Sequence, residues 1–168
     1  MERWQRIDRA STAEAAEELR ICCGAERWVK RMLARRPFGS LDAARAAARE
    51  EWWALPPDDW KEAFAHHPRI GDVSAVRARF GGVAGAASAR EQAGVAAAGD
   101  DILQALADGN LAYKSRFGYV FIVCATNKTA EQMLQILRER LTNGFGEEIL
   151  VAAGEHAKIC DLRLAVVV

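Results

Sequence analysis

Residues 146–166, GEEILVAAGEHAKICDLRLAV, contain the pattern that decides the fold class. Apolar side chains recur in this segment every three or four residues, which is the spacing of one face of an α-helix. These apolar residues are Ile149, Ala153, Ala157, Cys160 and Leu164. The segment therefore predicts a long helix whose apolar face is buried.

Helical patterns continue through most of the chain before this segment. Asn143 and Gly144 form a good helix stop, and Ser11 with Glu14 has the spacing of a capping box. Gly24 is expected to end the helix that Ser11 begins. Helices are predicted over about 11–22, around Trp28 and Met32, over 41–54 after Ser40, around Trp60, over 72–80, from Ser88 onward, over 100–116 and over 129–142.

Residues 119–125, YVFIVCA, are the only β-like run in the chain. One isolated strand cannot form a sheet, so we expect a buried extended strip between helices. Its buried backbone groups need partners from neighbouring helices, water or a ligand. We find no repeat, low-complexity tract or linker. The sequence therefore predicts one compact all-α domain of several helices over residues 1–168, with this single extended strip.

Charge and hydropathy argue against two classes of partner. The chain has 168 residues, 51% of them hydrophobic, and its 23 Lys and Arg equal its 23 Asp and Glu. Phosphate binding needs a basic excess, so nucleic acid is not expected as a partner. No apolar run reaches the roughly 18 residues that cross a bilayer, so no membrane partner is expected. Arg27, Arg31 and Arg35 are four apart and are expected on a solvated helix face.

The cysteines and histidines show no metal-binding pattern. Cys22, Cys23, Cys124 and Cys160 form no CxxC pair, and the three histidines have no zinc-ligand spacing. We expect reduced, mostly buried thiols in a cytoplasmic protein. The N-terminus has no apolar signal core, and residues 166–168 are not a peroxisomal ending, which fits this location.

The segment 63–72, AFAHHPRIGD, contains the first candidate for chemistry. Pro68 disfavours the helical conformation at His67, so we expect a helix to end there and to leave an imidazole at its C-terminal edge. The helix dipole favours a protonated imidazole at that position. The alternative is a histidine that only binds free carbonyl groups. His66 and His67 could not readily share a metal, because adjacent helical residues point about 100° apart.

Two further candidates have both a structural and a functional interpretation. Ser88 and Glu91 in SAREQAG have capping-box spacing, yet a helix N-terminus also offers amide donors to an anionic ligand. Arg163 lies next to the buried stripe of the last helix and needs an acceptor there. A structural salt bridge would provide one, and so would a substrate.

These segments together resemble the 2-oxo-4-hydroxy-4-carboxy-5-ureidoimidazoline (OHCU) decarboxylases. The resemblance covers about residues 10–166. It rests on the order and spacing of CCGAERWVKRML, RRPF, AFAHHPRIGD, SAREQAG, NLAYKSRFGYVFIVCATNKT, RLTN and KICDLRL. The chain departs from many members at Asn127, where they have glycine, and in the Gly- and Ala-rich residues 81–87. These departures affect local loop shape.

The resemblance implies an all-α fold, a homodimer and a role for each matching position. His67 matches the catalytic histidine, Glu91 an essential carboxylate, and Arg163 the active-site arginine. The remaining matches are substrate-binding positions: Pro68, Ser88, Gln92, Phe121, Ile122, Val123, Cys124 and Ala125. The implied reaction converts OHCU to (S)-allantoin and CO2, the last step from urate to allantoin.

The implied substrate explains why no cofactor or metal is expected. It carries a carboxylate on a carbon next to a C=N bond, and this imine accepts the electron pair that CO2 leaves behind. Two proton movements follow, which suit a histidine charged and oriented by Glu91. We expect Arg163 on a ring or ureido oxygen. The alternatives are an enzyme for a related ureido or purine-ring compound and a non-catalytic helical interaction module.

Overall fold

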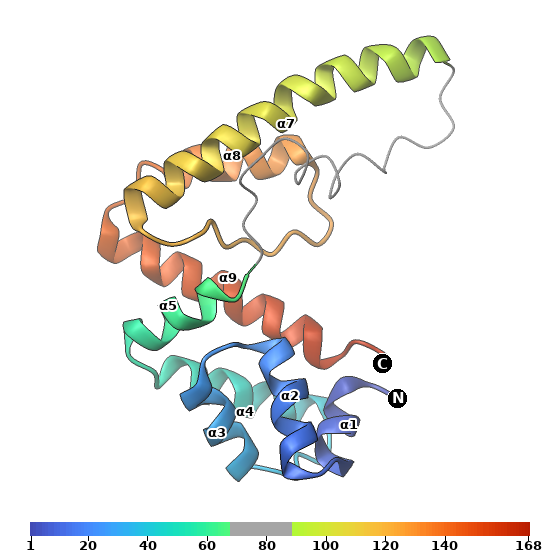
Figure 1. Ribbon diagram of the computed structural model, residues 1–168, viewed down its shortest axis with the longest axis vertical. Coiled ribbons are helices and arrows are strands. Elements are labelled where there is room, and N and C mark those ends of the chain that lie inside the picture. The colour runs from blue at the N-terminus through green and yellow to red at the C-terminus, as the bar shows by residue number, and fades with distance from the viewer. Residues whose placement is uncertain (68–88) are drawn as a thin grey trace. The chain divides into compact units, whose positions relative to one another are not determined.

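The computed structural model describes residues 1–67 and 89–168, with side chains for 1–67 and 99–168. These residues form helices and no strand (Figure 1), which confirms the predicted all-α fold. The helices are α1 (Arg3–Arg9), α2 (Thr12–Cys22), α3 (Glu26–Ala34), α4 (Leu41–Trp53), α5 (Pro57–Ala65), α7 (Ala89–Phe117), α8 (Ala130–Arg140) and α9 (Phe145–Leu164). The helix predicted over 72–80, the loop 81–87 and the cap at Ser88 lie outside the described residues.

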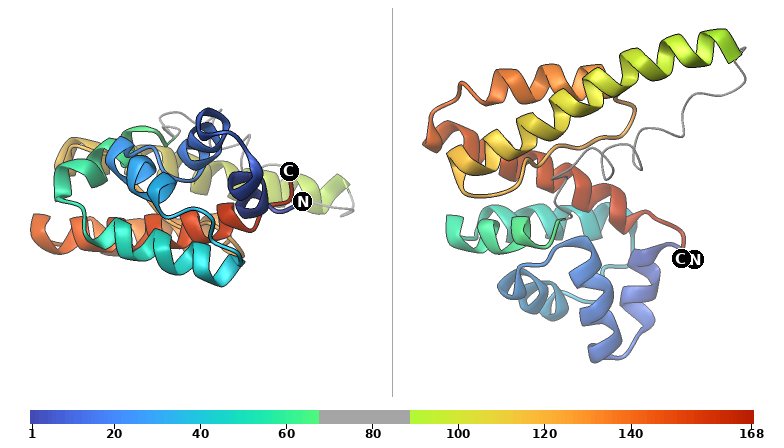
Figure 2. Two further views of the ribbon diagram at one scale, coloured as in Figure 1. Left: turned by 90° about the horizontal axis from the view of Figure 1, so that it is seen from below. Right: turned by 45° about the horizontal axis from the view of Figure 1, so that its top comes forward.

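The chain divides into two compact units. The first consists of Met1–His67 and Ile149–Val168, and the second is Pro68–Glu148. Both chain ends lie side by side within the first unit (Figure 2). There the Arg3 amide donates to the Val166 carbonyl at 2.8 Å. This contact ties the start of α1 to the residues that follow α9.

Side-chain caps set the start of two helices in the first unit. The hydroxyl of Ser11 accepts from the Glu14 amide at 3.3 Å, and the Glu14 carboxylate accepts from the Ser11 amide at 3.0 Å. The predicted capping box is therefore confirmed. Ser40 caps α4 by accepting from the Ala43 amide at 3.1 Å. The predicted helix stop near Gly24 is also confirmed, because α2 ends at Cys22.

Helix α1 was not predicted from the sequence. Its buried residues are Ile7 and Arg3, so it has no run of apolar side chains at helical spacing. Arg3 Nε instead pairs with the Glu18 carboxylate of α2 at 3.1 Å, and both side chains are largely buried. Ile7 and polar contacts, including a second ion pair from Arg6 to Glu18 at 2.9 Å, therefore hold this short helix on the unit.

Three tryptophans organise the core of the first unit. Their indole N–H groups donate at 3.0 Å to backbone carbonyls: Trp28 to Ala48, Trp52 to Ala153, and Trp60 to Trp52. A buried indole needs such a partner. Because these bonds start or end on α4, they hold α3, α5 and α9 against that helix.

The buried face of α9 differs in part from the predicted apolar stripe. Ala153, Cys160 and Leu164 are buried as predicted, but Ile149 and Ala157 are only half-buried. The buried residues of this helix are Glu148, Ala152, Ala153, His156, Cys160 and Leu164. A pattern of apolar residues overlooks Glu148 and His156, which are polar and still face inward.

In the second unit, the two helices predicted from Ser88 and over 100–116 are one continuous helix, α7. The prediction of a break was wrong. Gly99 lies inside this helix, and three alanines at 96–98 precede it. A glycine in a helix interior costs only about 1 kcal/mol relative to alanine, which good helix formers beside it can offset.

Residues 120–125 connect α7 to α8 without regular secondary structure, as the predicted extended strip requires. Asn127 follows with a φ of 61°, in the left-handed region. Asparagine tolerates this region better than most residues, so the turn keeps a backbone shape that suits glycine. Among the described helices, none is both long and apolar enough to cross a membrane.

Candidate active site

The position of α5 is fixed by polar contacts with α3. The Glu62 carboxylate accepts from the Glu26 amide at 2.9 Å and so satisfies a free donor at the start of α3. Arg27 pairs with Asp59 of α5 at 3.1 Å. The basic face predicted for α3 is therefore exposed but paired, since Arg31 and Arg35 also contact carboxylates.

A close backbone approach fixes the C-terminal end of α5. A Cβ on Gly24 would lie 2.4 Å from Cγ of His66, a distance that real atoms do not reach. Gly24 is thus required so that the imidazole of His66 can lie against the 23–25 backbone. His66 is the C-cap residue of α5, and its ring packs against the backbone at Gly24.

His67 lies just beyond the end of α5, as the sequence predicts. The helix ends at Ala65, and the His67 amide donates to the Phe64 carbonyl at 3.1 Å. The residue is half-buried. His67 therefore follows the C-cap of α5 directly, near the negative end of that helix's dipole.

A second imidazole, that of His156 on α9, lies next to His67. The two ring centroids are 5.1 Å apart and the planes are nearly perpendicular, at 84°. His156 also stacks on Trp52, with centroids 4.4 Å apart and planes 17° from parallel. Burial, with smaller contributions from the charges of His67 and Arg163, lowers the pKa of His156 to about 3. His156 is therefore a neutral imidazole at neutral pH.

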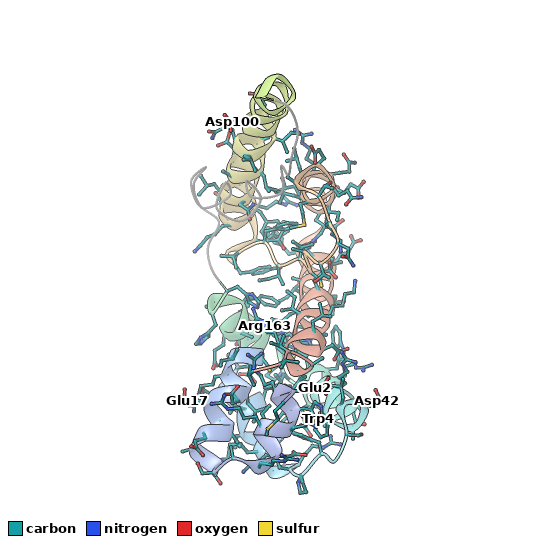
Figure 3. All side chains as sticks on the ribbon, turned by 90° about the vertical axis from the view of Figure 1, so that its right-hand side faces the viewer. Glu2, Trp4, Glu17, Asp42, Asp100 and Arg163 are labelled. Atoms are coloured by element: carbon teal, nitrogen blue, oxygen red, sulfur yellow. The ribbon has the colours of Figure 1, made fainter. Side chains whose placement is uncertain are left out.

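Arg163 lies near the C-terminal end of α9 (Figure 3). Its Nη1 donates to the Ile21 carbonyl at 2.9 Å and to the Cys22 carbonyl at 3.5 Å, at the end of α2. A cation is favourable at a helix C-terminus. No carboxylate in the described part of the chain pairs with Arg163, so of the two interpretations left open by the sequence the structural salt bridge is not found there. Its other guanidinium donors have no partner among these residues.

Two of the three buried thiols of this unit, Cys23 and Cys160, have raised pKa values, whereas the hydrogen bond with Cys160 lowers the pKa of Cys22. Cys22, Cys23 and Cys160 are free and buried, as predicted. Burial raises the pKa of Cys23 to about 12. A thiol with such a pKa is almost entirely protonated at neutral pH and is a weak nucleophile.

In the second unit, the extended strip is held through its carbonyl groups. Arg140 Nη1 donates to the Ile122 carbonyl at 2.6 Å, and Lys128 Nζ donates to the Cys124 carbonyl at 2.8 Å. Within the described residues, the amide N–H groups of Phe121 to Ala125 have no hydrogen-bond partner. Buried amides normally have one. Among the described residues, these amides are therefore candidates to bind the oxygen atoms of a ligand.

A buried ion pair between Arg140 and Glu148 holds the 121–125 strip in place. The Arg140 Nε donates to Glu148 Oε1 at 2.7 Å, and the Tyr113 hydroxyl donates to the same oxygen at 2.5 Å. The guanidinium also lies over the Phe121 ring, 4.6 Å from its centroid. Burial and the bond to Glu148 raise the pKa of Tyr113, which therefore stays a hydrogen-bond donor. These supporting residues were not predicted from the sequence, although Arg140 begins the RLTN segment.

The structure describes some of the predicted site residues with their side chains, some by backbone alone, and some not at all. His67 and Arg163 belong to the first unit and both act on the charge of His156. Phe121, Ile122, Val123, Cys124 and Ala125 belong to the second, with the middle three buried. Pro68 and Ser88 lie outside the described residues. Glu91 and Gln92 lie on α7, but their side chains are not described. Among the described residues, no group of three or more His, Cys, Asp or Glu side chains could hold a metal ion.

Comparison with known proteins gives one family. The family model for OHCU decarboxylase matches residues 8–165. The chain is 35% identical over 152 residues to the uric acid degradation bifunctional protein TTL of Arabidopsis thaliana, covering 89% of this chain and 46% of that protein. It is 46% identical over 55 residues to the OHCU decarboxylase of Amia calva, covering 33% of this chain and 31% of that one. The matched regions thus cover less than half the length of each of these two relatives.

Solved structures agree with this result. A crystal structure of an OHCU decarboxylase in the presence of (S)-allantoin is similar with a TM-score of 0.69 and 34% identity, over 88% of this chain and 94% of that chain. A crystal structure of an (S)-allantoin synthase has a TM-score of 0.62 and 19% identity, over 96% of this chain and 52% of that chain. The second similarity concerns the fold alone.

Proposed function

Because the chain belongs to the OHCU decarboxylase family, we propose that it converts OHCU to (S)-allantoin and CO2, the last step from urate to allantoin. The observation that carries the proposal is the similarity to an OHCU decarboxylase crystallised in the presence of (S)-allantoin, which extends over 94% of that chain. The activity makes the protein a carboxy-lyase of purine breakdown. The position of His67 at the end of α5 supports the same reaction.

The proposed reaction breaks one carbon–carbon bond. The bond between the ring carbon and its carboxylate breaks, and its electron pair moves toward the neighbouring C=N group. CO2 leaves, the imine nitrogen takes up a proton, and a neutral enol-like species remains. The hydroxyl then loses its proton while the adjacent ring carbon gains one, which gives allantoin. Since the substrate supplies its own electron sink, the proposed enzyme needs no cofactor or metal.

We assign the proton transfers to His67. An imidazole at the C-terminal end of a helix is stabilised in its protonated form, and it can give and take protons near neutral pH. Glu91 is proposed to orient this ring and to raise its charged fraction. Delivery of the proton to one face of the ring would give the (S) enantiomer alone.

Arg163 and the 121–125 strip are proposed to bind the polar groups of the substrate. Arg163 is anchored by one nitrogen on the Ile21 carbonyl, and its remaining donors can reach a ring or ureido oxygen. The unused amides of the strip would bind further oxygen atoms. Additional contacts are proposed for Pro68, Ser88 and Gln92.

We further propose that the protein is a homodimer and acts in the cytoplasm. The dimer is what the family resemblance implies. The location is supported by four free, buried cysteines, because free thiols are typical of reducing compartments.

An isotope experiment tests the proposed reaction. Urate labelled with ¹³C at the carbon that becomes the carboxylate is oxidised and hydrolysed in situ, and NMR follows the label. With the protein present, the label should appear in CO2 and bicarbonate much faster than in its absence. Label release at the protein-free rate would contradict the proposal, and turnover of a related ureido or purine-ring compound in a parallel assay would replace it.

A further inference from the structure

His156 is an unusual residue for the core position that it occupies. The side chain is 1% exposed, and neither Nδ1 nor Nε2 has a hydrogen-bond partner among the described residues. A neutral imidazole has one donor and one acceptor nitrogen, and burial without partners destabilises both. Leucine or phenylalanine would fill this place without that cost. The polar ring therefore calls for an explanation beyond packing.

The neighbours of His156 give its ring a fixed orientation. Trp52 stacks on it at 4.4 Å, and the indole of Trp52 is itself held by the Ala153 carbonyl. The Phe64 ring lies at 6.1 Å. His67 meets this rigid group at 5.1 Å with perpendicular planes, so the edge of one imidazole faces the plane of the other. The position of His67 is thus defined by a ring that cannot easily turn.

We propose that His156 is a positioning residue for His67, which it holds in one ring orientation while leaving the only mobile proton of the pair on His67. This inference rests on the proposed function, because the orientation of His67 matters only if that residue transfers protons. It assigns a role to a side chain that does not itself touch the substrate.

The groups around His156 keep its imidazole neutral, so the exchangeable proton of the pair is carried by His67. The titratable groups near His156 come from every side: His67 after α5, Cys23 before α3, Arg49 on α4, and Cys160, Asp161 and Arg163 on α9. Burial is the largest cause of the lowered pKa of His156, and the cations His67 and Arg163 add to it. A neutral His156 does not repel a protonated His67, whereas a second cation would.

A small cavity lies beside His156. It has a volume of about 10 Å³ and is lined by His156, Trp52, Cys23, Cys160 and Asp161, among others. Asp161 Oδ1 is also buried without a hydrogen-bond partner among the described residues. The lining of this cavity is mostly apolar, so it offers His156 no polar partner among the described residues.

Histidine NMR of the full-length protein tests the proposal, since the chain has only three histidines. In wild-type protein labelled with ¹⁵N-histidine, His156 should keep the shifts of a neutral ring from about pH 5 to 8, while His67 titrates. His156→Phe keeps a flat ring on Trp52 but removes both nitrogens. In this variant the His67 midpoint should shift by about 0.5 pH units or more, because its ring loses the polar neighbour that holds it in one orientation. The kcat should fall about tenfold with KM nearly unchanged.

Matched variants separate positioning from packing. Cys160→Ala changes the same buried face one turn further along α9 and should leave the His67 midpoint and kcat near wild type. His156→Gln retains a donor and an acceptor and should recover part of the His67 shift. This variant also covers the case in which His156→Phe does not fold.

Two results would overturn the proposal. One is a wild-type His156 that becomes protonated near pH 6 to 7. The other is a folded His156→Phe or His156→Gln protein in which the His67 midpoint and kcat both equal the wild-type values. A wild-type protein without OHCU turnover would instead refute the proposed function, and the NMR comparison would still decide the relationship between the two rings.

Discussion

The imidazole of His67 meets the imidazole of His156 edge to face, with centroids 5.1 Å apart and planes at 84°. His67 follows a helix end and is half-buried, whereas His156 is fully buried on α9 and neutral. The two histidines are 89 positions apart in the sequence, so only the fold brings them together. Their different environments give two identical side chains different protonation behaviour.

The neutral state of His156 predicts acid sensitivity. Its pKa is about 3 in the folded protein and about 6.5 when unfolded, so below pH 6.5 the unfolded chain binds the extra proton. Stability from this residue is therefore complete above that pH and is lost as pH falls from about 6.5 toward 3. Between pH 7 and 5, wild type should lose roughly 2 kcal/mol more than His156→Phe. Urea unfolding at both pH values measures this, and equal losses would contradict it.

Gly24 predicts a coupling between a loop and the end of α5. A Cβ at this position would collide with His66 at 2.4 Å, so Gly24→Ala must displace the ring and the chain that leads to His67. We expect a loss of roughly 1–3 kcal/mol in stability, together with reduced turnover. Gly99→Ala is the matched control, because no atom lies near its Cβ position and it should be neutral or stabilising. Thermal unfolding and initial rates of both variants compare them, and a Gly24→Ala protein as active and stable as wild type would refute the coupling.

Local signals allowed much of the fold to be predicted. The Ser11–Glu14 capping box, the Ser40 cap and the stop before Gly24 act within a few residues, and the structure confirms each. Pro68 likewise marked the end of α5 before His67. Helix α1 and the continuity of α7 were missed, because a single buried aliphatic residue and a tolerated glycine leave weak patterns.

Long-range contacts explain what the sequence could not predict in the site. Arg163 binds the Ile21 carbonyl from 142 positions away, and backbone acceptors leave no trace in a pattern of side chains. His156 lies on a mostly apolar face of α9. In the sequence, a single polar residue of this kind is easily taken for one that faces solvent. Arg140 and Glu148 form a buried pair that neither residue indicates alone. The roles of Glu91, Gln92, Ser88 and Pro68 stay predictions.

Replacement of Glu91 separates a cap from a catalytic carboxylate. Glu91→Gln keeps the geometry of a capping box, so stability should change little. If the carboxylate orients and charges His67, activity should fall by roughly two orders of magnitude or more. Steady-state rates and thermal midpoints measure the two effects. A Glu91→Gln protein with nearly full activity would reduce the residue to a helix cap.

The proposed mechanism predicts independence from metals and cofactors, because the substrate imine accepts the electron pair. Protein dialysed against a strong chelator should keep its turnover rate, measured alongside an undialysed sample. A large loss that a divalent cation restores would refute this mechanism.

The handedness of the product tests the central claim, that His67 carries the proton, most directly. OHCU also decays without enzyme, and that path has no reason to prefer one face of the ring. His67→Gln is similar in size and still forms hydrogen bonds, but it cannot transfer protons near neutral pH. When OHCU is generated in situ, circular dichroism should show (S)-allantoin with wild type and nearly racemic allantoin, formed at about the spontaneous rate, with His67→Gln. A His67→Gln protein that rapidly forms one enantiomer would contradict this account.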